Sequence, residues 1–378
     1  MNVLVFSPHP QPLSKMERGG VLSPTAKITK VGTPLRPGEG PGVRTSTSSL
    51  VQESGVMPIK SGIIGGAGYT GGEVIRILLN HPHVELAFIH SRSNAGKQIH
   101  AVHQDLTGDT DIKFTNTLAD CNVLFLCLGH GESKKFLEEN KVTPSTKVID
   151  LSHDFRHGEK IGDREFVYGL PEFQREEIRK ANNVANPGCF ATTIQLGLLP
   201  LAKAGLLTEV HTTGITGSTG AGQKLQDATH FTWRANNVSA YKTLSHQHMN
   251  EINQTLKKLQ PQFDEALHFV PWRGDFTRGI FVTSVLSSSL SLDEAKKLYR
   301  EFYSGHPFTF VCEEMVDIKQ VVNTNKCLIH LEKIGNKLAI HSVTDNLLKG
   351  ASGQAVQNMN LMFGFPEDAG LKLKGSVF

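Results

Sequence analysis

The sequence lacks the features that mark membrane-spanning and disulfide-built proteins. No apolar run in its 378 residues approaches the roughly 18 residues that a membrane span needs. The apolar run Val3–Phe6 near the N-terminus ends at Ser7-Pro8. This run is too short for the core of a signal peptide. The five cysteines are widely spaced, odd in number and without a C-x-x-C pair, which argues against a disulfide framework and a zinc site. We therefore expect a soluble, cytoplasmic protein.

The sequence also lacks a strong excess of either charge. Its 39 Lys and Arg residues stand against 36 Asp and Glu residues, a net charge of +3. Residues 1–56 hold six basic and three acidic residues, which accounts for the whole excess. The rest is neutral and has no basic stripe with interleaved aromatic residues, so we expect no nucleic-acid partner.

Residues 1–56 are poor in aromatic residues and show no apolar periodicity. They contain Phe6 as the one aromatic residue and seven of the 17 prolines. This composition is typical of disorder, and we predict a disordered N-terminal extension. A transit peptide is the alternative, although the prolines would break the amphipathic helix that such a peptide forms.

Short apolar strands alternate with helices from Ile59 onward. The expected strands are Ile59–Ile64, Val84–His90, Val123–Leu128 and Lys147–Leu151, with a helix over Gly71–Leu79. This alternation predicts an α/β domain with a parallel sheet.

The second half has a different pattern. An apolar helix from Cys189 to about Ala204 precedes strands at Phe269–Val270, Gly279–Ser287, Cys327–Lys333 and Lys337–Val343. Gly335-Asn336 suits a tight hairpin turn between the last two strands. Ser291–Glu294 reads as a capping box before a helix over Glu294–Tyr303, and a final helix is expected at about Ala351–Phe363. We expect an α+β region with a mixed or antiparallel sheet.

A glycine-rich turn follows the first strand and opens a helix. Gly66, Gly68 and Gly71 satisfy G-x-G-x-x-G, which lets the backbone approach a pyrophosphate at a helix N-terminus; an ordinary tight turn is the alternative. The second strand ends in Ser91-Arg92-Ser93, where an NAD-specific site would carry an acidic residue. A guanidinium with two hydroxyls favours the 2′-phosphate of NADP, against the alternative of a solvated arginine.

Asn186-Pro187-Gly188 forces a turn directly before Cys189. A cysteine in the first turn of a helix lies where the dipole and free N–H groups stabilise a thiolate, so we expect the pKa of Cys189 to be lowered. A buried structural cysteine is the alternative, which suits Cys121 and Cys127 in or beside an apolar strand.

Two further segments offer groups for chemistry. In the run His246–Glu251, one imidazole is positioned to exchange protons at a thiol adduct while Glu251 orients it. Metal binding by His246 and His248 is the alternative, but no third ligand is evident, and no metal is predicted. In Gly217–Gly222, the backbone N–H groups suit an anion such as a departing phosphate, and a flexible loop is the competing explanation.

Together these residues resemble the N-acetyl-gamma-glutamyl-phosphate reductase family, NADP-dependent enzymes of arginine biosynthesis. The likeness runs from Met57 nearly to the C-terminus, and its motifs keep the family's order: Gly65–Gly72, Ser91-Arg92-Ser93, Asp150-Leu151-Ser152, Asp154-Phe155-Arg156, Asn186–Cys189, His246–Glu251 and Arg278-Gly279-Ile280.

The resemblance implies an organisation. A Rossmann-type NADP-binding domain would occupy residues 57–188, and an α+β catalytic and dimerisation domain residues 189–344. Residues 345–378 would form a helix that returns to the first domain. A small-molecule acyl phosphate would be the substrate, and the chain would form a homodimer or homotetramer.

The resemblance also implies roles for single residues. The catalytic residues would be Cys189, His248, His246 and Glu251. The cofactor-binding residues would be Gly65, Gly66, Gly68, Tyr69, Thr70, Gly71, Ser91, Arg92, Gly129, Pro187 and Asn346. The substrate-binding residues would be Arg156, Ser218 and Arg278.

The implied mechanism is reduction through a thioester. Cys189 attacks the acyl phosphate and expels phosphate, NADPH delivers hydride, and His248 or His246 protonates the thiohemiacetal. The sequence departs from the family at Phe190-Ala191, where Tyr-Pro is usual, and at Gln223, where arginine is common. The run Pro271–Phe276 is also longer than expected. Aspartate-semialdehyde dehydrogenase and a non-catalytic NADP-binding regulator remain as alternatives, and the N-acyl group stays open.

Overall fold

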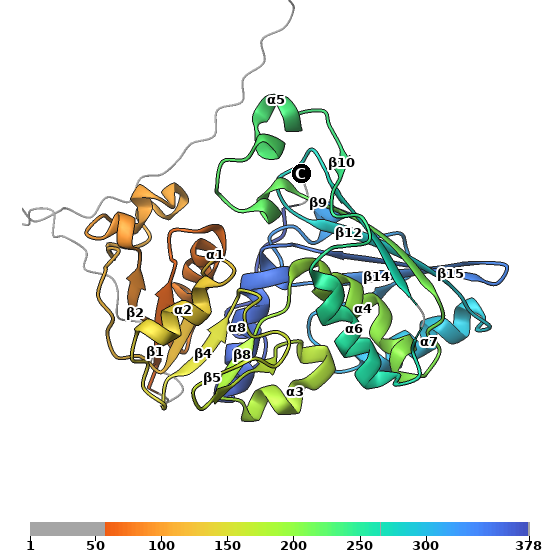
Figure 1. Ribbon diagram of the computed structural model, residues 1–378, viewed down its shortest axis with the longest axis horizontal. Coiled ribbons are helices and arrows are strands. Elements are labelled where there is room, and N and C mark those ends of the chain that lie inside the picture. Colours follow the sequence, from red (N-terminus) through yellow and green to blue (C-terminus); the bar gives the residue numbers. More distant parts are fainter. Residues whose placement is uncertain (1–56, 265, 377–378) are drawn as a thin grey trace, which may run out of the picture. The chain divides into compact units, whose positions relative to one another are not determined.

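The computed structural model describes residues 57–264 and 266–376. The predicted disordered extension at residues 1–56 lies outside the described residues. The described chain forms two large sheets with helices packed on them (Figure 1).

The first sheet has six strands, all parallel, in the order β2-β1-β3-β4-β8-β7. Its strands are β1 (Ile59–Ile64), β2 (Val84–His90), β3 (Val123–Leu126), β4 (Lys147–Asp150), β7 (Val167–Tyr168) and β8 (Asn183–Ala185). The helices between them are α1 (Tyr69–Leu78), α2 (Glu132–Glu139) and α3 (Pro171–Lys180). A small hairpin, β5 (Lys160–Ile161) and β6 (Arg164–Glu165), stands apart from both large sheets. The predicted parallel α/β domain is confirmed, and the structure adds β7 and β8 to it.

Helices cover both faces of this sheet because its strands are apolar on both sides. Ile63 joins one buried cluster with Val74 of α1, and its neighbour Ile64 joins another with Phe136 of α2. Val356 of the C-terminal helix lies in the same cluster as Ile63. This is the three-layer arrangement of a Rossmann-type domain.

The second sheet has seven strands in the order β10-β11-β9-β12-β15-β14-β13, with mixed directions. They are β9 (Val210–Thr216), β10 (Ser239–Ala240), β11 (Leu267–Arg273), β12 (Ile280–Ser287), β13 (Thr309–Cys312), β14 (Cys327–Ile334) and β15 (Lys337–Thr344). The predicted mixed sheet is confirmed.

Three helices pack on one face of this sheet: α4 (Cys189–Lys203), α6 (His248–Leu259) and α7 (Leu292–Tyr303). Burial alternates along β12, as expected for a sheet with only one covered face. A short helix, α5 (Phe231–Arg234), precedes β10. The hairpin at Gly335-Asn336 and the capping box of Ser291 with Glu294 both form as predicted.

The last helix, α8 (Gly353–Phe363), packs against the elements of the first sheet. It follows a π-helical turn at Leu348–Ser352 and packs on α3 and α1. In Figure 1 it appears in blue among the yellow and orange elements of the first sheet. This packing brings the segment after β15 close to the start of α4.

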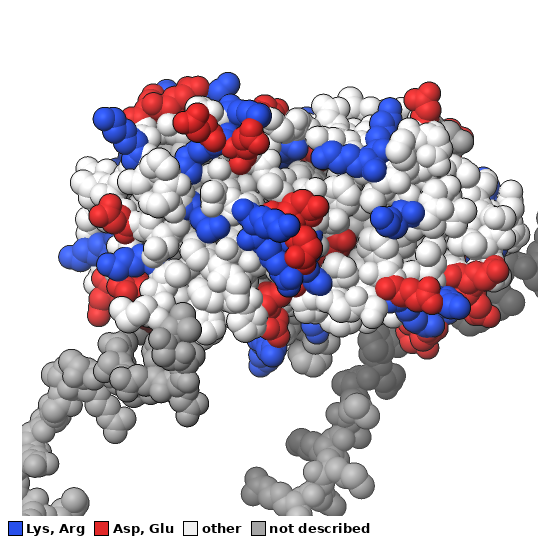
Figure 2. All heavy atoms as spheres, turned by 90° about the horizontal axis from the view of Figure 1, so that it is seen from below, with Lys and Arg blue, Asp and Glu red and all other residues white. Residues whose placement is uncertain are grey.

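The surface in Figure 2 carries basic and acidic side chains intermixed, with no continuous basic stripe on the face shown. Over residues 57–376 apart from 265, the helices are all too short or too polar to cross a bilayer.

Candidate active site

The glycine turn after β1 is built so that three of its glycines cannot carry a side chain. Gly65 has φ +78°, and a Cβ there would lie 2.3 Å from the carbonyl oxygen of Cys127. A Cβ on Gly66 would lie 2.2 Å from Ile89, and one on Gly71 would lie 2.6 Å from the oxygen of Gly65. The close approach of β1, β2 and α1 therefore requires these glycines.

Gly68 and Gly129 differ from these three glycines, because there is space beside each of them for a side chain. The nearest atom to a Cβ on Gly68 would be 3.5 Å away, and on Gly129 it would be 3.8 Å away. Gly68 is the N-cap of α1, and no described side chain caps it. Tyr69, which opens the helix, is exposed, and Thr70 is half-buried. These residues therefore fit an anionic pyrophosphate at the helix N-terminus.

A cavity of about 270 Å³ lies at the carboxyl ends of β1 and β2, with Gly65, Ser91 and Arg92 in its lining. Ser91 is buried, whereas Arg92 is exposed and begins a short 3-10 helix. The carboxyl edge of a parallel sheet is where nucleotides bind in this fold. The residues present fit a nucleotide at this edge of the sheet.

The backbone holds Cys189 at the junction of the two sheets. β8, the last strand of the first sheet along the chain, ends at Ala185. The buried residues Pro187 and Gly188 then lead into α4, which begins at Cys189. A Cβ on Gly350 of the π-helical turn would lie 2.9 Å from the Cβ of Cys189. The half-buried thiol is thus enclosed by α4 and the segment that leads into α8.

The predicted lowering of the Cys189 pKa is wrong for this structure. Burial raises the pKa of the thiol above its ordinary value, and the negative charge of Glu251 adds to the rise. The N–H of Phe190 and the charge of Arg156 act in the opposite direction without reversing it. Desolvation of the charged form outweighs the helix N-terminus here, so the resting cysteine is a thiol.

His248 is the histidine that lies closest to the cysteine turn. It opens α6, and its Nε2 would lie 2.3 Å from a Cβ on Gly188. Burial, with the positive charge of Arg156, lowers the pKa of His248 well below its usual value. The imidazole that packs on Gly188 is therefore neutral at neutral pH.

His246 has a different place. Its Nδ1 accepts the backbone N–H of His248 at 3.2 Å, and its ring packs edge-on to Phe190. Burial lowers the pKa of His246 to about 4. These contacts position the start of α6, so the structure brings both predicted histidines to the site in unequal roles.

Glu251 anchors the turn more than it orients an imidazole. Its carboxylate accepts the N–H of Gly188 at 3.1 Å, the hydroxyl of Tyr168 at 2.8 Å and Nη1 of Arg156 at 3.1 Å. Its distance to Nε2 of His248 is 3.9 Å, beyond a hydrogen bond. Tyr168, whose hydroxyl also accepts from Gln195 at 2.7 Å, was missed from sequence because its partners are remote along the chain.

Arg156 is buried, and its guanidinium is hydrogen-bonded to other groups of the chain. Besides Glu251, it donates to the carbonyl oxygens of Asn186 at 2.9 Å and Leu151 at 3.2 Å. A cavity of about 360 Å³ beside it is also lined by Lys134, His153 and His248. The exposed Lys134, which sequence reasoning missed, offers this cavity a positive charge.

The predicted anion cradle at Gly217–Gly222 is not present. The N–H groups of Gly217, Ser218 and Thr219 already donate to backbone oxygens of Gly279, Phe276 and Thr277. Asn346 joins the same two loops, because its Oδ1 accepts from Gly279 at 2.7 Å and its Nδ2 donates to Thr219 at 3.0 Å. Internal hydrogen bonds thus use the groups that an anion would need, although the half-buried Ser218 side chain stays at this junction.

Arg278, which the resemblance assigns to substrate binding, is likewise engaged by the chain itself. Its Nε and Nη2 each donate to Asp345 at 3.1 Å, and its Nη1 donates to Glu73 of α1 at 2.9 Å. Asp345 thus accepts the two parallel hydrogen bonds that the guanidinium could otherwise donate to a carboxylate. Because Asp345 follows β15 and Glu73 belongs to α1, Arg278 links α1 to the second sheet.

A Rossmann-type domain joined to a mixed-sheet domain, with a cysteine and a neutral imidazole at their junction, defines a nucleotide-dependent oxidoreductase of the semialdehyde dehydrogenase class. Family models agree: residues 60–181 match the semialdehyde dehydrogenase NAD binding domain, and residues 189–346 match the semialdehyde dehydrogenase dimerisation domain.

Curated relatives narrow the class to one family. A protein of Christiangramia forsetii named N-acetyl-gamma-glutamyl-phosphate reductase is 58% identical over 322 residues, covering 85% of this chain and 100% of that relative. One of the same name from Bacteroides thetaiotaomicron is 56% identical over 323 residues, again covering 85% and 100%. The chain belongs to the N-acetyl-gamma-glutamyl-phosphate reductase family, which confirms the resemblance drawn from its motifs.

Solved structures share the fold at low identity. Aspartate semialdehyde dehydrogenase II of Vibrio cholerae, complexed with ASA, matches with a TM-score of 0.65 and 16% identity, over 82% of this chain and 99% of that one. The Candida albicans aspartate semialdehyde dehydrogenase, solved with NADP, matches with a TM-score of 0.61 and 12% identity, over 81% and 98%. At such identities the likeness speaks for the fold alone.

Proposed function

We propose that this chain reduces an N-acyl-gamma-glutamyl phosphate, N-acetyl-gamma-glutamyl phosphate in the first place, to the glutamate semialdehyde with release of phosphate, a step of arginine biosynthesis. The observation that carries the proposal is the placement of Cys189 at the first residue of α4, with the neutral imidazole of His248 against the preceding Gly188. The names of the curated relatives supply the substrate.

The resting pair is a thiol and a neutral imidazole, since burial raises the pKa of Cys189 and lowers that of His248. As Sγ attacks the acyl carbon, the thiol proton passes to His248, the bond from carbon to the phosphate oxygen breaks, and phosphate leaves with the electron pair. The product on the enzyme is a thioester on Cys189. When bound, the reduced nicotinamide supplies the electron pair that reduces this thioester.

The imidazolium of His248 then returns its proton as the tetrahedral adduct collapses to aldehyde and free cysteine. His248 is assigned this exchange in preference to His246, because His246 already accepts the N–H of His248. Glu251 is a positioning residue, since its carboxylate holds both Gly188 and Arg156.

The proposed cofactor is NADP. Gly65, Gly66, Gly68, Tyr69, Thr70, Gly71 and Gly129 would hold the pyrophosphate and its surroundings, Ser91 and Arg92 the 2′-phosphate, and Pro187 and Asn346 the nicotinamide side. The exposed guanidinium at the rim of the 270 Å³ cavity is the observation that favours a phosphate over a free hydroxyl.

Substrate binding is proposed for the cavity beside Arg156 and His248. Arg156 would act through its charge and its hold on the cysteine turn. Ser218 and Arg278 are proposed to contribute to substrate binding as well, Arg278 through the ion pairs by which it joins Asp345 and Glu73.

We also propose that the chain works as a homodimer or homotetramer in the cytoplasm. Phe231 and Trp233, within the region that matches the dimerisation domain, are 80% and 54% exposed, as is common where a partner covers apolar surface. All five cysteines are free, which suits a reducing compartment. The functional division would follow residues 57–188, 189–344 and 345–378.

The proposed function is tested in the reverse direction, with N-acetyl-glutamate semialdehyde, phosphate and NADP. We expect phosphate-dependent formation of NADPH by the wild type, its loss in Cys189→Ala, and retained activity in Cys312→Ala, a matched change at another half-buried cysteine. Continued phosphate-dependent formation of NADPH by Cys189→Ala would overturn the mechanism.

A further inference from the structure

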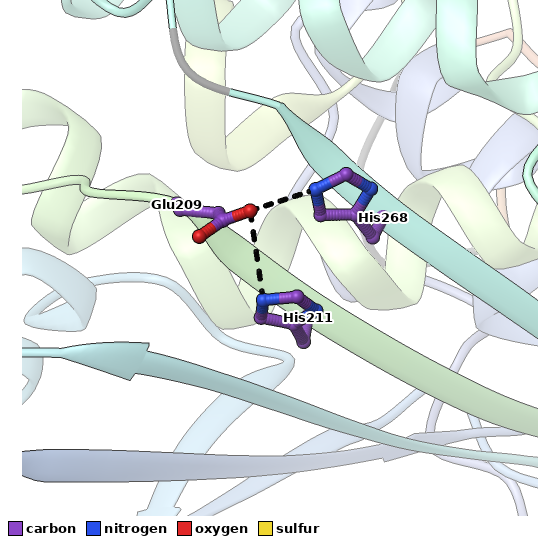
Figure 3. Close-up of side chains that lie close together, drawn as sticks. All are labelled: Glu209, His211 and His268. Carbon is purple, nitrogen blue, oxygen red and sulfur yellow. Dashed lines mark hydrogen bonds and ion pairs between the residues drawn. The ribbon is translucent and has the colours of Figure 1, made fainter.

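Two histidines and a glutamate form a cluster at the start of two neighbouring strands of the second sheet. His211 of β9 and His268 of β11 are paired in register in a parallel ladder. Glu209 stands two positions before His211, so its side chain points to the same face of the sheet. Figure 3 shows the three side chains converging, with both rings turned toward the carboxylate.

The distances between these atoms are close to those of a metal-ligand set. Oε1 of Glu209 lies 2.9 Å from Nε2 of His268 and 3.7 Å from Nε2 of His211. The three ligand atoms all lie within 4.8 Å of one another. In a tetrahedral site with bonds near 2.0–2.1 Å, ligand atoms stand about 3.3 Å apart. Small rotations of exposed side chains are enough to reach that geometry.

The environment leaves coordination positions open. The side chains of His211 and Glu209 are 64% and 57% exposed, and that of His268 is 35% exposed. The rings stack with centroids 4.9 Å apart, which presents two imidazole nitrogens side by side. Among the described residues, this is the one group of three His, Cys, Asp or Glu side chains with such convergence.

We infer that Glu209, His211 and His268 bind one divalent transition-metal ion, such as Zn²⁺, at the protein surface. Two imidazole nitrogens and one carboxylate oxygen form the donor set of zinc and related ions, whereas Mg²⁺ and Ca²⁺ prefer oxygen ligands. The ion replaces the hydrogen bond now formed between Glu209 and Nε2 of His268, and water fills the remaining positions. This site is separate from the residues assigned to the reductase reaction, so the inference does not rest on the proposed function.

Little in the sequence points to this site. The sequence pattern suggests metal binding only at His246 and His248, but in the structure His246 accepts the N–H of His248 and His248 packs on Gly188. Glu209 and His211 are close in sequence, but the strand pairing that adds His268 is visible only in the fold.

The test is a titration of untagged, chelator-treated protein with ZnCl₂ by calorimetry. A Cys189→Ser background keeps the reactive thiol from binding zinc. We expect one equivalent to bind, and His211→Ala, His268→Ala and Glu209→Gln each to weaken binding about tenfold or more. His341→Ala is the matched control, because it removes another imidazole that contacts a carboxylate on the same sheet, that of Glu332 at 3.0 Å.

Unchanged binding in His211→Ala and His268→Ala would overturn the inference, as would the absence of zinc binding below about 1 mM. Crystals soaked in Zn²⁺ give an independent reading. An anomalous peak among these three residues is expected, and a peak found only elsewhere would contradict the assignment. Melting temperatures of the variants verify that each protein is folded.

Discussion

The imidazole of His248 packs directly on the backbone of Gly188, so that a methyl group on this glycine would stand 2.3 Å from Nε2 and 2.5 Å from Cε1. The glycine is therefore needed for the approach of the ring to the cysteine turn. Glu251 fixes the same turn from the other side by accepting the N–H of Gly188.

Gly188→Ala should displace His248 and lower kcat by about 100-fold or more, because a shift of about 1 Å in a reacting group is that costly. Binding of NADPH, measured by fluorescence, should change little. Gly220→Ala is the control, since its Cβ would meet nothing closer than 3.5 Å. A Gly188→Ala enzyme with normal kcat would show that this contact has no part in catalysis.

The raised pKa of Cys189 predicts how its alkylation depends on pH. Below the pKa, the thiolate fraction changes tenfold for each pH unit, so the rate with iodoacetamide should climb from pH 6 to 8 and level only above the ordinary value of about 8.5. Peptide mass spectrometry follows Cys189 separately from Cys312. A rate that has already levelled at pH 6 would instead indicate a thiolate paired with an imidazolium.

The sequence predicted those parts of the fold that carry a strong local signal. β1 and β2 begin and end as expected because apolar residues cluster towards the end of each strand and turn residues follow, Gly65-Gly66 after β1 and Ser91 after β2. β7 and β8, with two and three residues, are too short to show a period. The start of α4 at Cys189 was predicted because Pro187 and Gly188 force the turn.

What the sequence could not show were the consequences of burial and of remote pairing. The thiol of Cys189 is desolvated by Gly350 and its neighbours, which come from the far end of the chain. Arg278 finds its partners 67 and 205 residues away, at Asp345 and Glu73. No local pattern distinguishes an arginine held in this way from one that is free to bind a substrate.

The pH dependence of stability should include a measurable contribution from His81. Burial lowers its pKa from 6.5 to about 4, although Asn360 hydrogen-bonds its Nε2 at 3.0 Å. Between these two pH values, the unfolded chain binds a proton that the folded one does not. Stability from this group is complete above pH 6.5 and falls as the pH is lowered toward about 4.

His81→Gln should therefore remove up to about 1.4 kcal/mol per pH unit from the slope of the unfolding free energy in that window. Urea titrations at several pH values measure the slope. His157→Gln, a change at an exposed histidine, should leave it unaltered. An equal slope in His81→Gln and the wild type would contradict the assignment.

Arg92→Ala should raise the KM for NADPH by about tenfold or more, because a charge-assisted hydrogen bond contributes about 1.5–3 kcal/mol. The KM for NADH should hardly change, since that cofactor has no 2′-phosphate. Steady-state kinetics with both cofactors provide the comparison. Similar increases for both would remove the argument for NADP at this position.

The central claim concerns the substrate, and its most direct test compares two aldehydes in the phosphate-dependent reverse reaction with NADP. The measurement is kcat/KM for N-acetyl-glutamate semialdehyde against kcat/KM for aspartate semialdehyde. We predict a preference for the N-acetylated substrate of at least about 100-fold, because a site that pairs the polar groups of one substrate leaves them unpaired with the other. A preference for aspartate semialdehyde would contradict the account.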